Sequence, residues 1–182
     1  MVAVFLAQGF EEVEAFTPLD YLRRCEELDV KTVGVTGKMV TGSHGITTIA
    51  DLSLEELNLE ELEMIILPGG MPGTINLEKS EKVQAIINYC IVNNIVIAAI
   101  CAAPSILGHK GILNGKKASC YIGFEDELIG ATVLNEPVVV DHNIITARGA
   151  GVANEFAFAL IEKLLSKARA QKVKDSVLWQ EK

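Results

Sequence analysis

Apolar runs rich in β-branched residues alternate along this chain with segments whose apolar residues recur at helical spacing. Strands are predicted at residues 2–7, 30–35, 64–67, 95–100 and 144–146. Because these runs are apolar at nearly every position, we expect the strands to be buried on both faces. Long helices are predicted at residues 15–28, 80–93 and 152–165.

Strands that alternate with helices in this way favour a mostly parallel sheet joined by right-handed crossovers. The predicted fold is therefore α/β and flavodoxin-like, a doubly wound and mostly parallel sheet with helices on both faces. With 182 residues, the chain is expected to form a single domain that spans residues 1–182.

Other segments interrupt or follow this alternation. Residues 38–50 and 119–140 carry turn residues and short β-like pieces, which predict a hairpin or a small added sheet. Residues 53–56 have capping-box spacing, so a short helix is predicted before the 64–67 strand. Residues 166–182 are highly charged but end with the apolar Val177, Leu178 and Trp179. This ending favours a helix and an arm that packs back onto the body.

The chain carries 16 basic and 24 acidic residues, a formal net charge of −8. A surface of this sign repels a phosphate backbone, so no direct nucleic-acid binding is expected. No apolar run reaches the length of a membrane span, and the apolar start lacks the basic region of a signal peptide. The four cysteines lack paired C-x-x-C spacing. We therefore expect no metal site, reduced thiols and a cytoplasmic location.

The loop after the 95–100 strand is the first candidate for chemistry, because ligands of open parallel sheets sit beyond the carboxyl ends of strands. The strand ends at Cys101, and a helix is predicted to begin within a few residues. At such an elbow the helix N-terminus favours thiolate over thiol, so Cys101 is expected to be nucleophilic and oxidisable. The alternative is a buried small hydrophobe, the usual state of a free cysteine.

Two other loops also follow predicted strands. Residues 68–73 place Gly69 and Gly70 where backbone N–H groups can approach a ligand, as in an oxyanion hole, although glycines also simply form turns. Residues 9–14 carry three glutamates, most of which should form a solvated helix N-terminus. One of them, Glu14, is considered as an acid or base, because a carboxyl group buried beside a thiol has a raised pKa.

The remaining cysteines and the histidines are weaker candidates. Cys25 and Cys90 lie on predicted helix faces, where a core thiol is expected. Cys120 ends a short predicted strand beside Tyr121 and could line the same cleft, although nothing local would lower its pKa. None of the three histidines is next to Cys101 in the sequence, so nothing positions a cysteine–histidine dyad.

Four motifs occur in chain order: G-F-E-E-V-E at 9–14, I-L-P-G-G at 66–70, A-I-C-A-A-P at 99–104 and T-A-R-G-A-G at 146–151. Together they resemble the ThiJ/PfpI superfamily and, within it, the parkinsonism-associated deglycase branch. The resemblance runs from the first predicted strand to the 152–165 helix. It implies a homodimer with the flavodoxin-like fold of class I glutamine amidotransferases.

The resemblance also implies a catalytic pair, in which Glu14 is hydrogen-bonded to the sulfur of Cys101, with backbone donors at Gly70 and Ala102. The residues that it places in or near the cleft are Tyr121, Cys120 and Arg148. The implied activity is cofactor-free processing of methylglyoxal, glyoxal or other small 2-oxoaldehydes, or of their adducts with amines and thiols on proteins and nucleotides. Two alternatives remain open: a redox-sensing chaperone whose cysteine oxidises to sulfinate, and a scaffold whose thiol has no selected substrate.

Two departures from the wider family bear on the chemistry. Tyr121 stands where animal members of the branch carry a histidine near the thiol, as in bacterial members, which leaves Glu14 as the expected proton shuttle. Ala102 stands where the peptidase relatives carry a histidine directly after the cysteine, so protease activity is disfavoured. No histidine follows His142, which argues against a glutamine amidotransferase.

Overall fold

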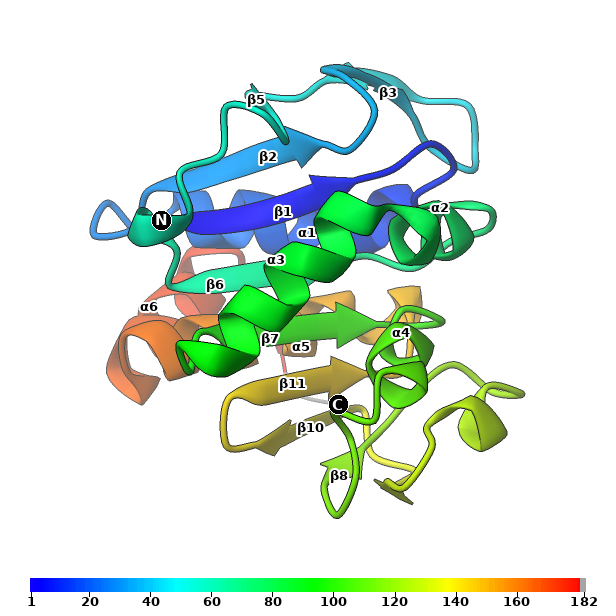
Figure 1. The fold of residues 1–182 in the computed structure, drawn as a ribbon. Coiled ribbons are helices and arrows are strands. Elements are labelled where there is room, and N and C mark those ends of the chain that lie inside the picture. Colours follow the sequence, from blue (N-terminus) through cyan, green and yellow to red (C-terminus); the bar gives the residue numbers. More distant parts are fainter. Residues whose placement is uncertain (181–182) are drawn as a thin grey trace.

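The computed structural model describes residues 1–180, which form a central seven-stranded sheet in the order β10-β11-β7-β6-β1-β2-β5 (Figure 1). Its strands are β1 (Val2–Leu6), β2 (Val30–Gly34), β5 (Leu52–Ser53), β6 (Met64–Leu67), β7 (Val96–Ile100), β10 (Val138–Asp141) and β11 (Ile144–Ala147). Neighbouring strands are parallel except β10, which is antiparallel to β11. The inner strands follow the 2-1-3-4-5 order of flavodoxin-like folds. The predicted fold class is therefore confirmed.

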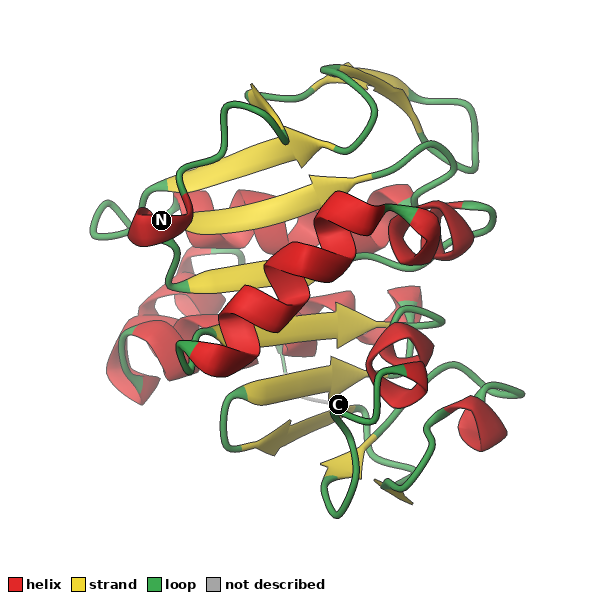
Figure 2. Ribbon diagram, in the orientation of Figure 1, coloured by secondary structure: helices red, strands yellow, loops and turns green. Residues whose placement is uncertain are grey.

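Helices cover both faces of this sheet (Figures 1 and 2). One face is covered by α2 (Gly73–Lys79), α3 (Glu81–Val92) and α4 (Pro104–His109), and the other by α1 (Glu12–Arg23), α5 (Ala153–Leu164) and α6 (Lys167–Ser176). A hydrophobic core lies on each face of the sheet, and alternate residues of β1 point into one or the other. Ala3 and Phe5 pack under α3, whereas Val4 and Leu6 pack under α1 and α5. This double burial explains why the strands are apolar throughout.

The predicted strands and long helices are all present, with ends shifted by a few residues. The largest shift is in α1, which begins three residues before the predicted start and ends at Arg23. It begins early because the side chain of Glu11 caps the helix, accepting the backbone N–H of Glu14 at 2.7 Å. The spacing of apolar residues does not predict this capping contact, so the early start of the helix was missed.

The added segments form two small sheets. The predicted hairpin at 38–50 is β3 (Met39–Thr41) paired antiparallel with β4 (Thr47–Ile49). In the second segment, β9 (Thr132–Val133) pairs in parallel with β8 (Lys117–Ala118), and β10 joins the main sheet. Three 3₁₀ helices complete the described part of the chain: η1 (Leu59–Glu61), η2 (Glu125–Glu127) and η3 (Ala150–Val152).

A short helix does precede the 64–67 strand, as predicted, but it is η1 and does not begin at the capping-box residues 53–56. The backbone N–H of Ser53 does bond to the side chain of Glu56 at 2.8 Å, as in a capping box. However, Ser53 is paired with Gly34 of β2, so the contact closes a turn after β5 and the nearest helix is η1.

The C-terminal prediction of a helix and a packed arm is confirmed as far as the structure describes it. After α6, Trp179 packs edge-on against Phe158 of α5, with ring centroids 5.5 Å apart. Residues 181–182 of the predicted arm lie outside the described residues. Among residues 1–180, no helix combines the length and the apolar character needed to cross a membrane.

Candidate active site

Four neighbouring strands carry the candidate residues on the loops at their carboxyl ends. β1 leads through residues 7–11 into α1, which holds Glu14, and β6 leads into the glycine loop at 68–73. β7 ends at Cys101, and β11 ends before Arg148. Because β11, β7, β6 and β1 are adjacent in this order, the sheet brings all four loops to one edge. This edge is where flavodoxin-like folds bind ligands.

Cys101 occupies a sharp and strained elbow between β7 and α4. Its φ of 66° lies in the left-handed region, which costs a residue other than glycine about 1–3 kcal/mol. The surrounding structure holds this conformation: the N–H of Cys101 donates to Ala147 of β11 at 2.9 Å, and its carbonyl accepts the N–H of Tyr121 at 2.8 Å. The thiol is partly exposed, so the elbow presents it at the sheet edge as the sequence predicts.

Glu14 lies beneath this thiol and is 1 % exposed. One carboxylate oxygen accepts the backbone N–H of Gly69 at 2.9 Å, and the carboxyl group is also hydrogen-bonded to Cys101. Burial raises its pKa to about 7, the charge of Glu11 adds to the rise, and the hydrogen bonds oppose it. The raised pKa expected for this glutamate is therefore found.

The expected lowering of the Cys101 pKa is not found. Burial raises the pKa of the thiol to about 12, and the negative charge of Glu14 adds to this rise. Backbone hydrogen bonds from Ala102 and Gly70 favour the thiolate, but they are outweighed. Helix α4 begins only at Pro104, so its N-terminus does not compensate for burial. These effects keep Cys101 in the thiol form at neutral pH, and the carboxyl group of Glu14 is the hydrogen-bonded neighbour of that thiol.

Gly69 packs closely against both Cys101 and Glu14. A Cβ atom at this position would lie 2.6 Å from the Cβ of Cys101 and 2.7 Å from Oε2 of Glu14. Contacts this short force the thiol and the carboxylate apart, so only glycine allows their hydrogen bond.

The Gly69→Ala variant is expected to lose about 1–3 kcal/mol of unfolding free energy through overpacking. We also expect kcat/KM to fall about 100-fold, because the reacting groups are displaced by about an ångström. Urea unfolding and steady-state kinetics measure the two effects. Gly151→Ala is the stability control, since its Cβ would meet nothing within 4 Å. Equal unfolding midpoints for the two variants would refute the close packing at Gly69.

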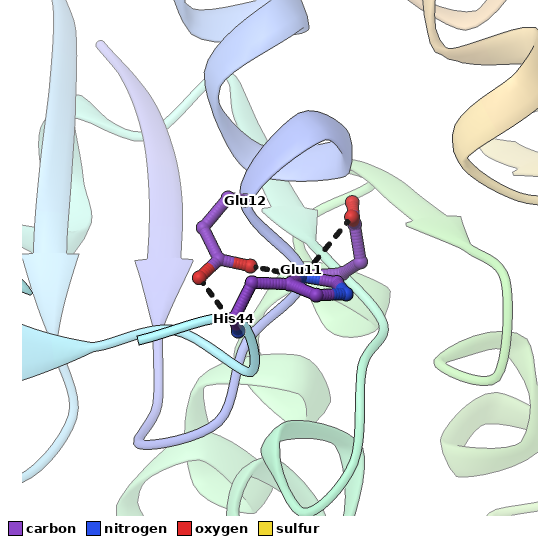
Figure 3. Close-up of side chains that lie close together, drawn as sticks. All are labelled: Glu11, Glu12 and His44. Carbon is purple, nitrogen blue, oxygen red and sulfur yellow. Dashed lines mark hydrogen bonds and ion pairs between the residues drawn. The ribbon is translucent and has the colours of Figure 1, made fainter. Parts of the chain in front are cut away.

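The glutamates before Glu14 are not a solvated helix N-terminus, contrary to expectation. Glu12 is 5 % exposed, and its carboxylate accepts the backbone N–H of His44 and faces the imidazole Nδ1, both at 2.8 Å (Figure 3). Burial alone would raise the pKa of Glu12, but these bonds lower it. Glu11 lies 3.8 Å from the same ring nitrogen. Three such groups could hold a cation, but the bonds that Glu12 already makes give it a structural role, fastening the β3–β4 hairpin to α1.

A pocket of about 320 Å³ lies beside Glu14, because a Cβ atom on its lining residue Gly149 would be 3.7 Å from Oε1 of this glutamate. It is lined by Tyr121, Ile122, Pro137, Arg148 and residues 149–152. Tyr121 and Arg148 thus lie where the resemblance places cleft residues. Cys120 is 4 % exposed and does not line the pocket, and burial raises its pKa to about 11. Cys25 and Cys90 are buried free thiols, as expected.

The histidines bond to carboxylates away from the thiol. His44 bonds to Glu12 and His142 to Asp141. His109, at the end of α4, places its two ring nitrogens 2.5 Å from Glu78 and 2.7 Å from Glu127. Within residues 1–180, therefore, no hydrogen bond links a histidine to Cys101.

Comparison with known protein families matches residues 1–163 to the DJ-1/PfpI family. The chain belongs to the DJ-1/PfpI family. Protein dj-1beta of Drosophila melanogaster is 34 % identical over 96 % of this chain and 95 % of its own length. Deglycase PfpI of Pyrococcus furiosus is 35 % identical over 83 % of this chain and 92 % of its own length. Protein DJ-1 homolog B of Arabidopsis thaliana is 36 % identical over 94 % of this chain, which spans only 40 % of that protein.

Solved DJ-1 structures share the complete fold described here. A DJ-1 superfamily protein of Salmonella typhimurium, solved as a cysteine-to-alanine mutant, superposes with a TM-score of 0.93 at 32 % identity, covering 99 % of this chain and 98 % of the other. Oxidized Toxoplasma gondii DJ-1 gives the same score and coverage at 33 % identity. These similarities confirm the resemblance seen in the four motifs.

Proposed function

We propose that this DJ-1/PfpI family member is a cysteine-dependent enzyme that converts small 2-oxoaldehydes, such as methylglyoxal and glyoxal, or removes their early adducts from amines and thiols. The observation that carries this proposal is the pair formed by Cys101 and Glu14, in which a buried carboxyl group with a pKa of about 7 bonds to a nucleophile. The family includes proteins named deglycases, which supports a reaction of this class.

The first step forms the bond between enzyme and substrate. The Glu14 carboxylate takes the proton of Cys101, and the thiolate attacks the aldehyde carbon while the carbonyl electrons move to oxygen. The N–H groups of Gly70 and Ala102, which already bond to the sulfur, are placed to stabilise this oxyanion. Protonated Glu14 then returns its proton to the oxygen, giving a hemithioacetal.

The second stage moves a proton between two substrate carbons. Glu14 removes the proton from the carbon bound to sulfur and delivers it to the neighbouring carbon. The hydroxyl proton moves from the oxygen of the first carbon to the oxygen of the second, which leaves a thioester. Water hydrolyses the thioester to lactate and restores the thiol. One carbon is oxidised while its neighbour is reduced, so the atoms and electrons balance without an external oxidant or hydride donor. With an adduct as substrate, the thiolate forms its bond to the carbon that carries the amine or thiol, and that carbon's bond to the amine or thiol breaks. Protonated Glu14 supplies the proton to the leaving group, and the same hemithioacetal results.

The test uses reduced, metal-free protein incubated with methylglyoxal, followed by enzymatic measurement of lactate. Saturable production of lactate is the expected result. No lactate above the buffer rate, together with a gain of two oxygen atoms on Cys101 after mild peroxide, would refute the enzymatic proposal. That outcome would favour the alternative, a redox-sensing chaperone whose exposed thiol oxidises to sulfinate. A solved relative in oxidized form is the observation that keeps this alternative open.

We further propose that the protein is a cytoplasmic homodimer. All four cysteines are free, which fits a reducing compartment. Exposed apolar side chains gather on α1 and the β3–β4 hairpin, with Val13 at 48 %, Ile46 at 54 % and Ile49 at 77 % exposure. Sedimentation velocity should show a dimer that the Ile49→Lys variant shifts towards monomer. A wild-type monomer at every concentration would overturn the dimer.

A further inference from the structure

Arg148 differs from the other arginines of this chain in its surroundings. The other three are Arg23, Arg24 and Arg169, and each forms an ion pair, with Asp51, Asp20 and Glu27 respectively. The guanidinium of Arg148 has neither a hydrogen bond nor an ion pair with any residue in the range 1–180, although this side chain is partly buried. A partly buried cation without a partner is unfavourable unless an anion can reach it.

The backbone fixes Arg148 between the sheet and the active-site elbow. Its N–H donates to the carbonyl of Pro137 at 3.1 Å, and the preceding residue, Ala147, accepts the N–H of Cys101. Arg148 belongs to the wall of the 320 Å³ pocket, whose other members include Tyr121 and Pro137. A pocket of this size can hold a ligand of a few heavy atoms.

This pocket adjoins the reacting pair. A Cβ atom on Gly149, which lines the pocket next to Arg148, would lie 3.3 Å from the ring of Tyr121 and 3.7 Å from Oε1 of Glu14. The Tyr121 backbone also bonds to the carbonyl of Cys101. A small molecule whose aldehyde carbon is at the thiol can therefore extend past Gly149 towards the guanidinium.

We propose that Arg148 forms an oxyanion subsite of the active site, which binds a carboxylate or phosphate group at the far end of the substrate. This inference rests on the proposed function and narrows its substrate class: the preferred 2-oxoaldehydes and adducts carry a negative charge. The guanidinium can make two parallel hydrogen bonds to either group. The negative charge of Glu14 excludes the anion from the position of the reacting carbon and so orients the substrate.

The first test uses two alkylating agents of nearly equal size, the anion iodoacetate and the neutral iodoacetamide. In both reactions the Cys101 sulfur forms a bond to carbon and iodide leaves. The measurement is the ratio of the two rate constants, followed by peptide mass at Cys101. We expect Arg148→Gln to lower the ratio of iodoacetate to iodoacetamide about tenfold, because a charged hydrogen-bonded pair contributes at least about 1.4 kcal/mol. Arg148→Lys should retain part of the preference.

The control is Arg24→Gln, which removes the same charge from the far end of α1, where Arg24 pairs with Asp20. It should leave the ratio at the wild-type value. Adding inorganic phosphate or acetate to the wild type tests which anion binds more tightly, since the better ligand suppresses the iodoacetate rate at lower concentration. An unchanged ratio in Arg148→Gln, or an equal fall in Arg24→Gln, would overturn the subsite.

The second test measures turnover of a 2-oxoaldehyde that ends in a carboxylate against that of its neutral methyl ester. Wild type should favour the acid, and Arg148→Gln should lose that preference through a rise in KM for the acid. The labelling ratio does not depend on turnover. A labelling preference without product would therefore refute the proposed enzyme while retaining the anion subsite, whereas turnover without any preference in either test would refute the subsite alone.

Discussion

Replacing Cys101 with serine is expected to lower kcat/KM for methylglyoxal at least about 1,000-fold, because the proposed reaction has no other nucleophile. The serine hydroxyl is close in size to the thiol, and the elbow is held by backbone bonds to Ala147 and Tyr121. The fold should therefore survive the change. However, a hydroxyl group is far harder to deprotonate than a thiol, and Glu14 with a pKa of about 7 is too weak a base for it.

Enzymatic measurement of lactate checks the Cys101→Ser prediction, with circular dichroism as the test of folding. Cys25→Ser is the matched control, since Cys25 is buried under the other end of α1 and bonds only weakly to Tyr21. It should keep activity within a few-fold of wild type. Full activity in folded Cys101→Ser would remove this thiol from the mechanism.

Replacing Glu14 with glutamine is expected to reduce kcat/KM about 1,000-fold, the usual contribution of a positioned acid–base group. Glutamine keeps the size of the side chain and can still pair with the N–H of Gly69. It cannot accept the Cys101 proton or move a proton between substrate carbons. Reactivity of Cys101 towards iodoacetamide near pH 7 should fall in the same variant, which separates loss of thiolate from loss of substrate binding.

The pH profile gives a second test of Glu14. Below about pH 7 both members of the pair are protonated, whereas above it the pair holds one proton and can form the thiolate. The wild-type kcat/KM should therefore rise with pH to a plateau above about 7, and Glu14→Gln should lack that step. Persistence of the step in Glu14→Gln would assign it to another group.

Stability should follow the opposite trend. The pKa of Glu14 in the folded state lies above its ordinary value of 4.5, so the contribution of this group to stability is fully present below pH 4.5 and is lost as pH rises through about 7. The free energy of unfolding of Glu14→Gln should lack this decline. Denaturant unfolding at several pH values measures the difference.

Much of the fold was predictable because the sheet buries both faces. β6 spans the predicted residues 64–67, since a buried parallel strand requires an apolar residue at every position. Helix α2 was missed because it begins at Gly73 and carries few apolar residues in helical spacing. The short helix predicted before β6 does not begin at residues 53–56, because strand pairing between Ser53 and β2 outweighs a local capping contact.

The site was predictable in its residues but not in its electrostatics. Glu14 and Cys101 are 87 positions apart in the sequence, and the four motifs identified both of them through family resemblance. The direction of the Cys101 pKa depends on burial and on the charge of Glu14, which are tertiary effects. The burial of Glu12 was also unpredictable, because its partner His44 comes from a hairpin 32 residues away. Arg148 appeared in a motif, but its lack of a partner is visible only in three dimensions.

Three acidic side chains at the start of α1 make three different contacts. Glu11 caps the helix, Glu12 fastens the β3–β4 hairpin, and Glu14 holds the reactive thiol. Each glutamate contacts a different neighbour, so an aspartate, one methylene shorter, would fall short of the partner of Glu12 or of Glu14, whereas it could still cap the helix at position 11. Val13, the half-exposed residue between them, makes none of these contacts, and its side chain belongs to the proposed dimer surface. A substitution at Val13 would therefore act on that surface and leave the helix cap, the hairpin and the contact between Glu14 and Cys101 in place.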